Sequence, residues 1–275
     1  MSFLVPAPGT VLSRSIEDYP EGIVLPVNKP YRWTSADVIR KLKYAAIKHF
    51  GKKNLKVGHA GTLDPLATGV LLVCIGQACK RAQKLQDHDK EYIAAIRFGA
   101  TTPSYDLEKD IDERYPFEHI TEDTVREALK GFLGQQEQVA PLFSAKSIDG
   151  VRAYEIARRH YRRGEPVPDN LLQCSRITIH QLELLSFGIS LPSSPLDDAS
   201  NASSRINVTD TSAYGFPEAS VRIRCSKGTY IRAFARDLGE AVGSGAHLAG
   251  LIRCVSGDFN LGNVLSVEQA LELLK

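Results

Sequence analysis

The chain has 275 residues, of which 43% are hydrophobic and 24% are charged, and its formal net charge is only +2. This length can bury a sizeable core as one large domain or two small ones, and the composition is typical of a globular protein. No apolar run approaches the roughly 20 residues of a membrane helix, and residues 1–14 lack the features of a signal peptide. Five cysteines without tight pairing indicate reduced thiols. We therefore expect a cytoplasmic protein that is not associated with a membrane.

Basic residues gather in three segments, although the total charge is low. Residues 40–56 and 152–164 are basic runs, and five cations lie within residues 222–236, while the acidic stretch 106–113 offsets them. A polyanionic partner requires only one basic face, so the small net charge is compatible with RNA binding. Taken alone, each run is more simply explained as a solvated helix face. The three together favour a polyanion as the partner.

The first part of the chain predicts a helix followed by two strands. Residues 33–50 have helical periodicity, and Thr34 with Asp37 fits a capping box at the start. Residues 69–76 are a short apolar run bounded by glycines, which predicts a buried strand. Residues 91–99 alternate between two faces, which predicts a second strand. The inward side of the helix is expected to consist of Val38, Leu42, Ala45 and His49.

The second part predicts further helices, a strand and a polar loop. Residues 121–134 have a helical pattern, whereas residues 192–217 are rich in Ser, Asp, Asn and Pro and predict a mobile surface insertion. Residues 219–225 alternate as a strand, residues 231–238 follow as a helix, and residues 266–275 form a short helix. Because strands and helices do not alternate as βαβ units, the α+β class is favoured. In the helix predicted over residues 121–134, the core side is expected to consist of Val125, Leu129 and Phe132.

Several familiar catalytic and cofactor motifs do not occur. "GHAG" at residues 58–61 is not a dinucleotide fingerprint, "SKGTY" at residues 226–230 is not a phosphate-binding loop, and neither G-x-S-x-G nor H-E-x-x-H is found. Cys74 and Cys79 have no second pair that would complete a zinc site, so we interpret them as small buried hydrophobic residues. The sequence therefore gives poor support for binding of nucleoside triphosphates, for a metal site and for serine chemistry.

"GHAGTLDPLATGV", residues 58–70, places one carboxylate, Asp64, between a glycine-rich turn and an apolar run. Gly58 and Gly61 permit a tight backbone, and Pro65 restricts the aspartate to an extended conformation. A side chain held in this way is preorganised. From the spacing alone, however, an aspartate that caps a turn is a simpler interpretation than a catalytic one.

Five segments, in order, strongly resemble the motifs of the TruB-type tRNA pseudouridine synthases. They are "NKPYRWTSADVIRKLK", "VGHAGTLDPLATGVLLVCIGQACK", "DKEYIAAIRFG", "PLFSAKSIDGVRAYEIAR" and "CSKGTYIRAFARDLGEAVGSGAHLAGLIR". The resemblance covers most of the chain and implies the pseudouridine synthase fold, a mixed, largely antiparallel sheet flanked by helices and loops. It also implies a reaction in which uracil leaves C1′ of its ribose, rotates and re-attaches through C5, with no cofactor and no metal.

The resemblance implies a catalytic role for three residues. Asp64 matches the family's invariant aspartate, which the reaction requires in its ionised form. Arg232 matches the arginine that pairs with this carboxylate, and a guanidinium within ~4–6 Å counters the rise in pKa that burial causes. Tyr92 matches the tyrosine that stacks on the target uracil. Without the motifs, Arg232 would be an exposed residue of a first helical turn and Tyr92 a core tyrosine.

Five further residues are implied to bind the substrate or support the site. His59 matches a histidine that occupies the space left when the target nucleotide is flipped out of its stack. Tyr230 matches a residue beside the target nucleotide, and Leu251 an apolar wall of the uracil pocket. Lys29 supports the active-site loop, and Arg152 belongs to the basic segment that contacts RNA phosphates. Taken singly, the first three would be ordinary packing or hydrogen-bonding residues.

We therefore expect one catalytic domain over residues 1–275, with an RNA-clasping insertion near 140–165 and a mobile loop at 192–217, and no C-terminal PUA module. Residues 101–112 depart from the T-D-T-x-D-x-x-G-like stretch of the family, so no contact is assigned to them. The predicted function is isomerisation of the uridine at position 55 in the T-loop of tRNA, by a monomer. Alternatives are the same reaction on another RNA, or a tRNA-binding folding factor. An aspartate-nucleophile hydrolase is disfavoured because no second acidic or metal-binding motif accompanies Asp64.

Overall fold

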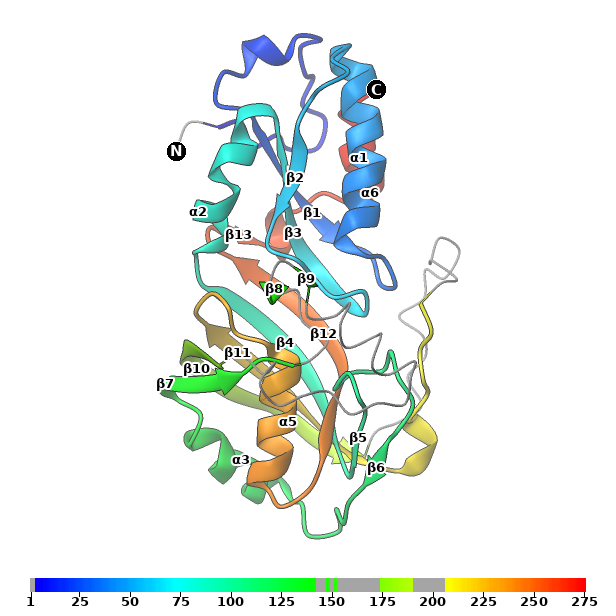
Figure 1. Ribbon diagram of the computed structural model, residues 1–275, viewed down its shortest axis with the longest axis vertical. Helices are drawn as coiled ribbons and strands as arrows, with labels where there is room; N and C mark the ends of the chain where they lie inside the picture. The colour runs from blue at the N-terminus through cyan, green and yellow to red at the C-terminus, as the bar shows by residue number, and fades with distance from the viewer. Residues whose placement is uncertain (1–2, 142–146, 149–150, 153–173, 190–205) are drawn as a thin grey trace. The chain divides into compact units, whose positions relative to one another are not determined.

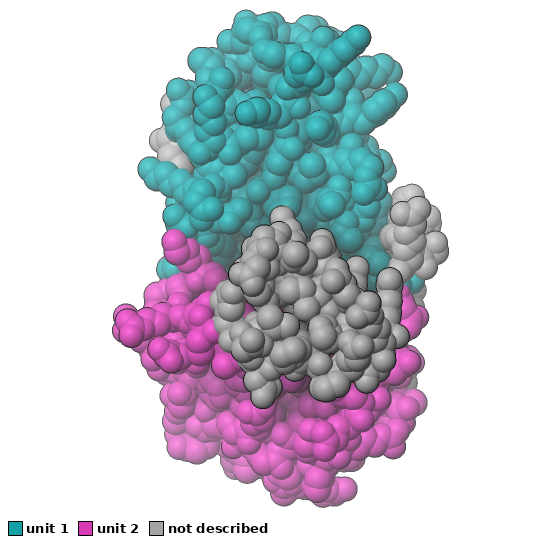
Figure 2. All heavy atoms as spheres, in the orientation of Figure 1, with its two compact units in different colours: residues 1–93, 194–206, 251–275 teal, residues 94–193, 207–250 magenta. Residues whose placement is uncertain are grey.

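The computed structural model of the protein describes residues 3–141, 147–148, 151–152, 174–189 and 206–275 (Figure 1). The chain divides into two compact units, each assembled from separate stretches of sequence (Figure 2). The first unit comprises Met1–Ile93, Ser194–Ile206 and Leu251–Lys275, and the second comprises Ala94–Ser193 and Asn207–Gly250. Strands β4 (Lys90–Phe98) and β12 (Ala246–Ser256) contribute residues to both units.

The first unit is built on a sheet in which β1 (Ile23–Lys29), β3 (Ala67–Ile75) and β12 lie in that order. Strand β1 is antiparallel to β3, whereas β12 is parallel to it. The central position of β3 explains its burial, because residues 70–75 are each at most 1% exposed. The apolar run predicted as a buried strand is therefore confirmed.

Short strands and helices complete the first unit. Helix α1 packs beside α6, and α2 contacts β2 (Figure 1). Strand β2 pairs with β3, and β13 pairs with β12. The bounds of these elements are α1 (Ser35–Phe50), β2 (Val57–Ala60), α2 (Ala82–Gln86), β13 (Phe259–Asn260) and α6 (Val267–Glu272), with 3-10 turns at η1 (Ile16–Asp18), η2 (Gly76–Arg81) and η6 (Leu261–Asn263).

Helix α1 confirms the helix predicted over residues 33–50. Thr34 Oγ1 accepts a hydrogen bond from Asp37 N at 3.0 Å, and the Asp37 carboxylate accepts one from Thr34 N at 3.0 Å, which completes the predicted capping box. The inward side differs from the expectation at one turn, where Ala46 is buried and Ala45 only half-buried.

In the second unit the strand order is β12, β4, β11, β10 and β7. Strand β10 is antiparallel to both β11 and β7, and helices α3 and α5 pack against each other. The bounds are α3 (Glu122–Lys130), β7 (Gly134–Val139), β10 (Cys174–Ile189), β11 (Pro217–Cys225) and α5 (Ile231–Ala241). Smaller elements are β5 (Ala100–Thr101) paired with β6 (Glu113–Arg114), β8 (Ser147–Ile148) paired with β9 (Val151–Arg152), and η5 (Ser212–Tyr214).

Two expectations for the second unit are corrected. Helix α3 ends at Lys130, so Phe132 follows the helix; its ring still packs edge-on against Phe234, with centroids 5.2 Å apart. Within the polar stretch 192–217, Thr211 and Phe216 are buried, so this end of the stretch is packed and is not a surface loop. Residues 190–205 and most of the insertion expected near 140–165 lie outside the described residues.

The architecture is α+β, with a mixed, largely antiparallel sheet flanked by helices, as the sequence predicts. Among the helices that the structure describes, none has the length and apolar character needed to cross a membrane.

Candidate active site

Asp64 begins a tight turn in the first unit. Its backbone carbonyl accepts a hydrogen bond from Ala67 N at 3.1 Å, and Pro65 occupies the second position of the turn, where proline is favoured. Gly61, three residues earlier, has a φ of +92°, a conformation that glycine adopts without strain. Gly58, by contrast, lies within β2 and has no positive φ, so only one of the two glycines shapes the turn as expected.

The first residue of helix α1 fixes the turn from one side. Ser35 Oγ donates a hydrogen bond to the carbonyl of Leu63 at 3.0 Å and accepts one from its N–H at 2.9 Å. Ser35 and Leu63 are both buried. Because both polar groups of Leu63 are bound to one hydroxyl, the residue before Asp64 is held in a defined orientation against the helix start.

Lys29, at the end of β1, supports the residue that follows Asp64. Its side chain is 0% exposed, and its ammonium donates to the carbonyls of Pro65 at 3.1 Å and Pro30 at 2.8 Å, and also to that of Trp33. Burial lowers the pKa of Lys29 to about 7, an effect that the negative charge of Asp64 opposes. The lysine therefore contributes both a backbone support and a positive charge close to the turn.

Arg253 in β12 is a support that the sequence reasoning did not identify. It is only 2% exposed, and its guanidinium donates to the carbonyls of Gly61 at 3.1 Å, Thr62 at 3.3 Å and Val70 at 2.7 Å. Gly69 of β3 lets the backbone of β12 come close at Arg253, since a Cβ there would lie 2.3 Å from the Arg253 carbonyl oxygen. The sequence signal that could have identified Arg253 was strand alternation, which places its side chain on the same face of the strand as Leu251.

Three other predicted residues of the first unit lie on strands. Leu251 of β12 is in register with Ala67 of β3, at the end of the Asp64 turn. Tyr92 of β4 is buried, and His59 of β2 is half-buried opposite Val73 of β3. The structure therefore brings Lys29 and Leu251 to the Asp64 turn, and it gives Tyr92 the burial that its strand pattern predicted.

Arg232 lies in the first turn of α5, in the second unit. It is 6% exposed, so the interpretation as an exposed helical residue is wrong. Its Nη1 donates to the carbonyl of Ser104 at 3.0 Å, and its Nε lies 3.6 Å from Oδ2 of Asp106, which is also buried. The predicted pairing of Arg232 with Asp64 stays a prediction.

Asp106 comes from the stretch to which the sequence assigned no contact. Its Oδ1 accepts hydrogen bonds from Ser104 Oγ at 2.6 Å and Glu108 N at 3.0 Å, which leaves Oδ2 turned toward Arg232. The neighbouring Tyr105 has a φ of +56°, a left-handed conformation that is costly for a residue with a Cβ. Within this stretch, residues 104–106 thus form a turn with a strained backbone at Tyr105 that orients a buried carboxylate toward Arg232.

Tyr230 is the N-cap of helix α5 and is half-buried. Gln138 of β7 binds its backbone on both sides: Oε1 accepts from Tyr230 N at 2.8 Å, and Nε2 donates to the Tyr230 carbonyl at 3.1 Å. This amide fixes the backbone of the residue that precedes Arg232 by two positions. Arg152 lies in β9, but its side chain is outside the described part of the chain.

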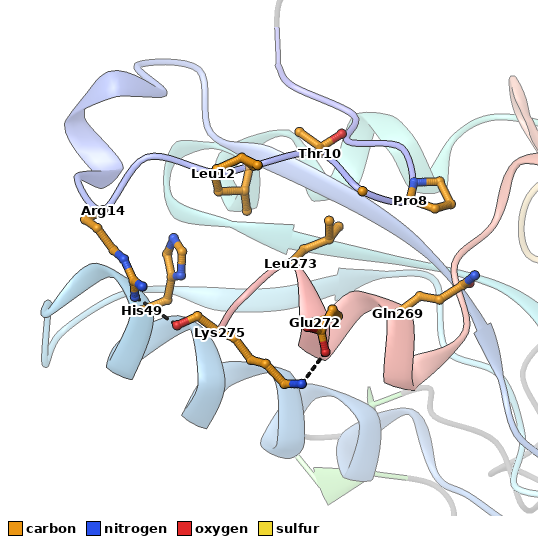
Figure 3. Close-up of a pocket in the computed structure, with 11 residues that line it drawn as sticks. Pro8, Thr10, Leu12, Arg14, His49, Gln269, Glu272, Leu273 and Lys275 are labelled. Atoms are coloured by element: carbon orange, nitrogen blue, oxygen red, sulfur yellow. Dashed lines mark hydrogen bonds and ion pairs between the residues drawn. The ribbon is translucent and has the colours of Figure 1, made fainter.

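A cavity of about 360 Å³ also lies in the first unit, between the N-terminal segment, the end of α1 and α6 (Figure 3). His49 and Leu273 line it, and no predicted site residue does. His49 lies fourteen residues after Ser35, which is about 20 Å along a helix, so this cavity is remote from the Asp64 turn. No group of three potential metal ligands occurs among the described residues.

Comparison with known proteins agrees with these features. The N-terminal domain profile of the TruB family pseudouridylate synthases matches residues 47–194. The tRNA pseudouridine synthase B of Phocaeicola vulgatus is 48% identical over 257 residues, which cover 94% of this chain and 95% of that protein. The corresponding protein of Bacteroides thetaiotaomicron is 49% identical over 253 residues, which cover 91% and 92%.

Solved structures share the fold. A Cbf5–Nop10–Gar1 complex matches with a TM-score of 0.59 and 23% identity, over 94% of this chain and 56% of that chain. An archaeal box H/ACA Nop10–Cbf5 complex matches with a TM-score of 0.57 and 20% identity, over 98% and 58%. This chain thus spans just over half the length of those structures, whereas it spans nearly all of the relatives named above. With the profile and the relatives in agreement, the chain belongs to the TruB family of pseudouridylate synthases.

Proposed function

We propose that this protein isomerises uridine to pseudouridine at position 55 in the T-loop of tRNA. Pseudouridine formation follows from the family, and tRNA follows from relatives that are named tRNA pseudouridine synthase B. The observation that carries the proposal is the support of the Asp64 turn. Three buried side chains, Lys29, Ser35 and Arg253, bind its main chain, so one carboxylate is preorganised in the segment that resembles the family's catalytic motif.

The reaction breaks the bond from C1′ to N1 and forms one from C1′ to C5, while a proton leaves C5 and N1 gains one. No atom is added overall, so the chemistry requires positioning more than an external reagent. In this proposal Asp64 acts on the target nucleotide and Arg232 keeps its carboxylate ionised, since a nearby guanidinium lowers a carboxyl pKa. Tyr92 stacks on the uracil, and Leu251 forms an apolar wall beside it.

The target base must leave its stack before this chemistry, at a cost of a few kcal/mol. We propose that His59 occupies the vacated space and that Tyr230 contacts the flipped nucleotide. The basic segment that includes Arg152 contributes phosphate contacts, whose strength falls as salt rises. We further propose that the enzyme acts as a monomer in the cytoplasm, where its five free cysteines stay reduced.

The test is the variant Asp64→Asn, incubated with a T-arm hairpin. Asparagine keeps the shape of the side chain and removes its charge, so product formation should be abolished while the hairpin is still bound. Pseudouridine formation at a wild-type rate would overturn the assignment of Asp64. Wild-type activity on other RNAs but not on the T-arm hairpin would favour the same chemistry on a different substrate, and rescue of tRNA folding by Asp64→Asn would favour a folding factor.

A further inference from the structure

The outward face of helix α1 carries a row of cations around an exposed tyrosine. Arg40, Tyr44 and Lys48 are spaced four residues apart, so they lie in one line along the helix. Lys41 and Lys43 flank this line, and all five residues are exposed, Tyr44 to 75%. We refer to these five residues as the basic face of α1. The opposite side of the helix packs into the first unit through Val38, Leu42, Ala46, His49 and Phe50.

The basic face is poor in compensating acids. Arg40 pairs with Asp37 at 2.9 Å, but among the residues that the structure describes no carboxylate forms an ion pair with Lys41, Lys43 or Lys48. Arg40 and Lys43 are like charges three residues apart, an arrangement that destabilises a helix slightly. Lys41 Nζ lies 5.0 Å from the centroid of the Trp33 ring, which is a cation–π contact. Ion pairing among the described residues does not explain why Lys43 and Lys48 lie on this face.

The basic cluster within residues 222–236, near the start of α5, has more carboxylate partners than the basic face of α1. Arg222 pairs with Glu183 at 2.5 Å, and Arg236 pairs with Asp237 at 2.6 Å. Arg232, in the same cluster, is buried beside Asp106. Three of the five cations of that cluster thus have carboxylate partners, whereas on the basic face of α1 only Arg40 has one among the described residues. The basic face of α1 therefore offers most of its charge to an external anion.

The position of α1 relates this face to the Asp64 turn. The helix begins at Ser35, which binds Leu63, and it rises about 1.5 Å per residue. Lys43 therefore lies about 12 Å, and Lys48 about 20 Å, along the axis from the end that contacts the turn. Phosphates on one strand of double-stranded DNA follow one another at about 3.4 Å along the axis, and we use this spacing as an order-of-magnitude scale for an RNA stem. The face thus matches a backbone about four to six nucleotides from a base held at Asp64.

We propose that the basic face of α1 binds the phosphate backbone of the stem that carries the target loop, remote from the target uridine. Lysines bind phosphates as point charges, and Tyr44 offers a surface on which a ribose or base can stack, as in surfaces that track a nucleic-acid backbone. The inference rests on the proposed function, because it takes the position of the RNA from Asp64. It adds a second contact region on the RNA, separate from the loop that reacts.

The experiment uses two hairpins with the same target loop and with stems of two or ten base pairs, the short stem being held closed by a covalent link between its strands. Wild-type protein should bind the long-stem hairpin about tenfold more tightly, and the variant Lys41→Ala/Lys43→Ala/Lys48→Ala should lose that advantage while its affinity for the short-stem hairpin is unchanged. The slope of log affinity against log salt should fall by about 2–3 for the long-stem hairpin only. The turnover rate at saturating RNA should not change.

A matched control removes the same charge elsewhere. Arg126, Lys130 and Lys275 are exposed and each pairs with a glutamate, so Arg126→Ala/Lys130→Ala/Lys275→Ala should retain the long-stem advantage. An equal loss in both triple variants, or an undiminished advantage in the α1 variant, would overturn the inference. If the wild type binds but modifies neither hairpin, the proposed function fails while the binding comparison still decides the role of α1. If product forms normally and stem length has no effect, only the α1 inference fails.

Discussion

The two units orient their functional side chains in different ways. In the first unit, Asp64 is positioned through the main chain of its turn, which Lys29, Ser35 and Arg253 bind. In the second unit, Arg232 is positioned through its own guanidinium, which contacts Ser104 and Asp106. Support through the main chain holds the turn by bonds to backbone carbonyls and N–H groups. A guanidinium has five N–H donors, so it can be bound by its surroundings and still face another group.

The largest expected effect comes from the main-chain support. Arg253→Met removes a buried guanidinium and leaves the carbonyls of Gly61, Thr62 and Val70 without its N–H groups. We expect a loss of about 3–5 kcal/mol in the free energy of unfolding. We also expect a fall in kcat of about 100-fold, because the Asp64 turn would be displaced. Urea unfolding and single-turnover kinetics measure the two quantities.

A second buried arginine provides the control for this prediction. Arg97 pairs with Glu218 at 2.6 Å and donates to Thr211 at 2.9 Å in the second unit. Arg97→Met should destabilise the protein by a similar amount and leave kcat unchanged at a temperature where both variants are folded. A similar fall in kcat for both variants would show that lost stability, and not lost positioning, explains the result for Arg253.

The next prediction concerns the side-chain support in the second unit. Asp106→Asn keeps the acceptor for Ser104 and Glu108 but removes the negative charge beside Arg232. We expect kcat to fall about tenfold to 100-fold, with a loss of about 1–3 kcal/mol in stability. Glu218→Gln makes the same chemical change at the Arg97 pair and should not alter kcat. A wild-type kcat for Asp106→Asn would mean that Arg232 is positioned without its buried partner.

The units also differ in how pH affects them. His247, in the second unit, is fully buried, and burial lowers its pKa to about 4. Its Nδ1 lies 2.9 Å from the Ala100 carbonyl, so it donates there, and its Nε2 accepts from Thr211 Oγ1 at 3.1 Å. These bonds require the neutral ring. Between pH 6.5 and 4 the unfolded chain binds the proton and the folded chain does not, so stability falls as the pH falls through this window.

We expect a loss of about 2 kcal/mol between pH 6.5 and 5 from His247. Urea unfolding at the two pH values measures it, and His247→Gln should remove this part of the pH dependence although it lowers stability at both. Lys29, in the first unit, has its window elsewhere, because its pKa is lowered to about 7. Its contribution becomes more favourable as the pH rises from 7 toward 10.5. An unchanged slope in His247→Gln between pH 6.5 and 5 would contradict the assignment.

The smallest expected effects come from the N-terminal caps of two helices, one of which lies beside the Asp64 turn. Thr34 caps α1 and Thr121 caps α3, and both form capping boxes. Thr34→Ala and Thr121→Ala should each cost about 1 kcal/mol in thermal unfolding. Only Thr34→Ala should also lower kcat, by a few-fold, because the next residue, Ser35, binds Leu63 beside Asp64. Equal activities in the two variants would show that fraying of the α1 start does not reach the turn.

The sequence alone determined the features that depend on neighbouring residues. The capping box at Thr34 follows from two residues three apart, and the burial of β3 follows from an uninterrupted apolar run. The place of Asp64 between a glycine-rich turn and an apolar run is equally local. The resemblance to the family then implied a role for Asp64, Tyr92 and Arg232 that spacing alone did not support, and the comparisons confirm the family.

The resemblance implied a supporting role for Lys29, but only the tertiary structure revealed the other supports, because their partners are far apart in the chain. Arg253 binds carbonyls 183 to 192 residues away, and Arg232 binds one 128 residues away. Asp106 lies in a stretch that departs from the family pattern, so no motif pointed to it. A periodicity or turn signal reports the path of the backbone within a few residues. The acceptors of a buried cation are set by which strands and helices pack together, since burial without such partners is prohibitively costly.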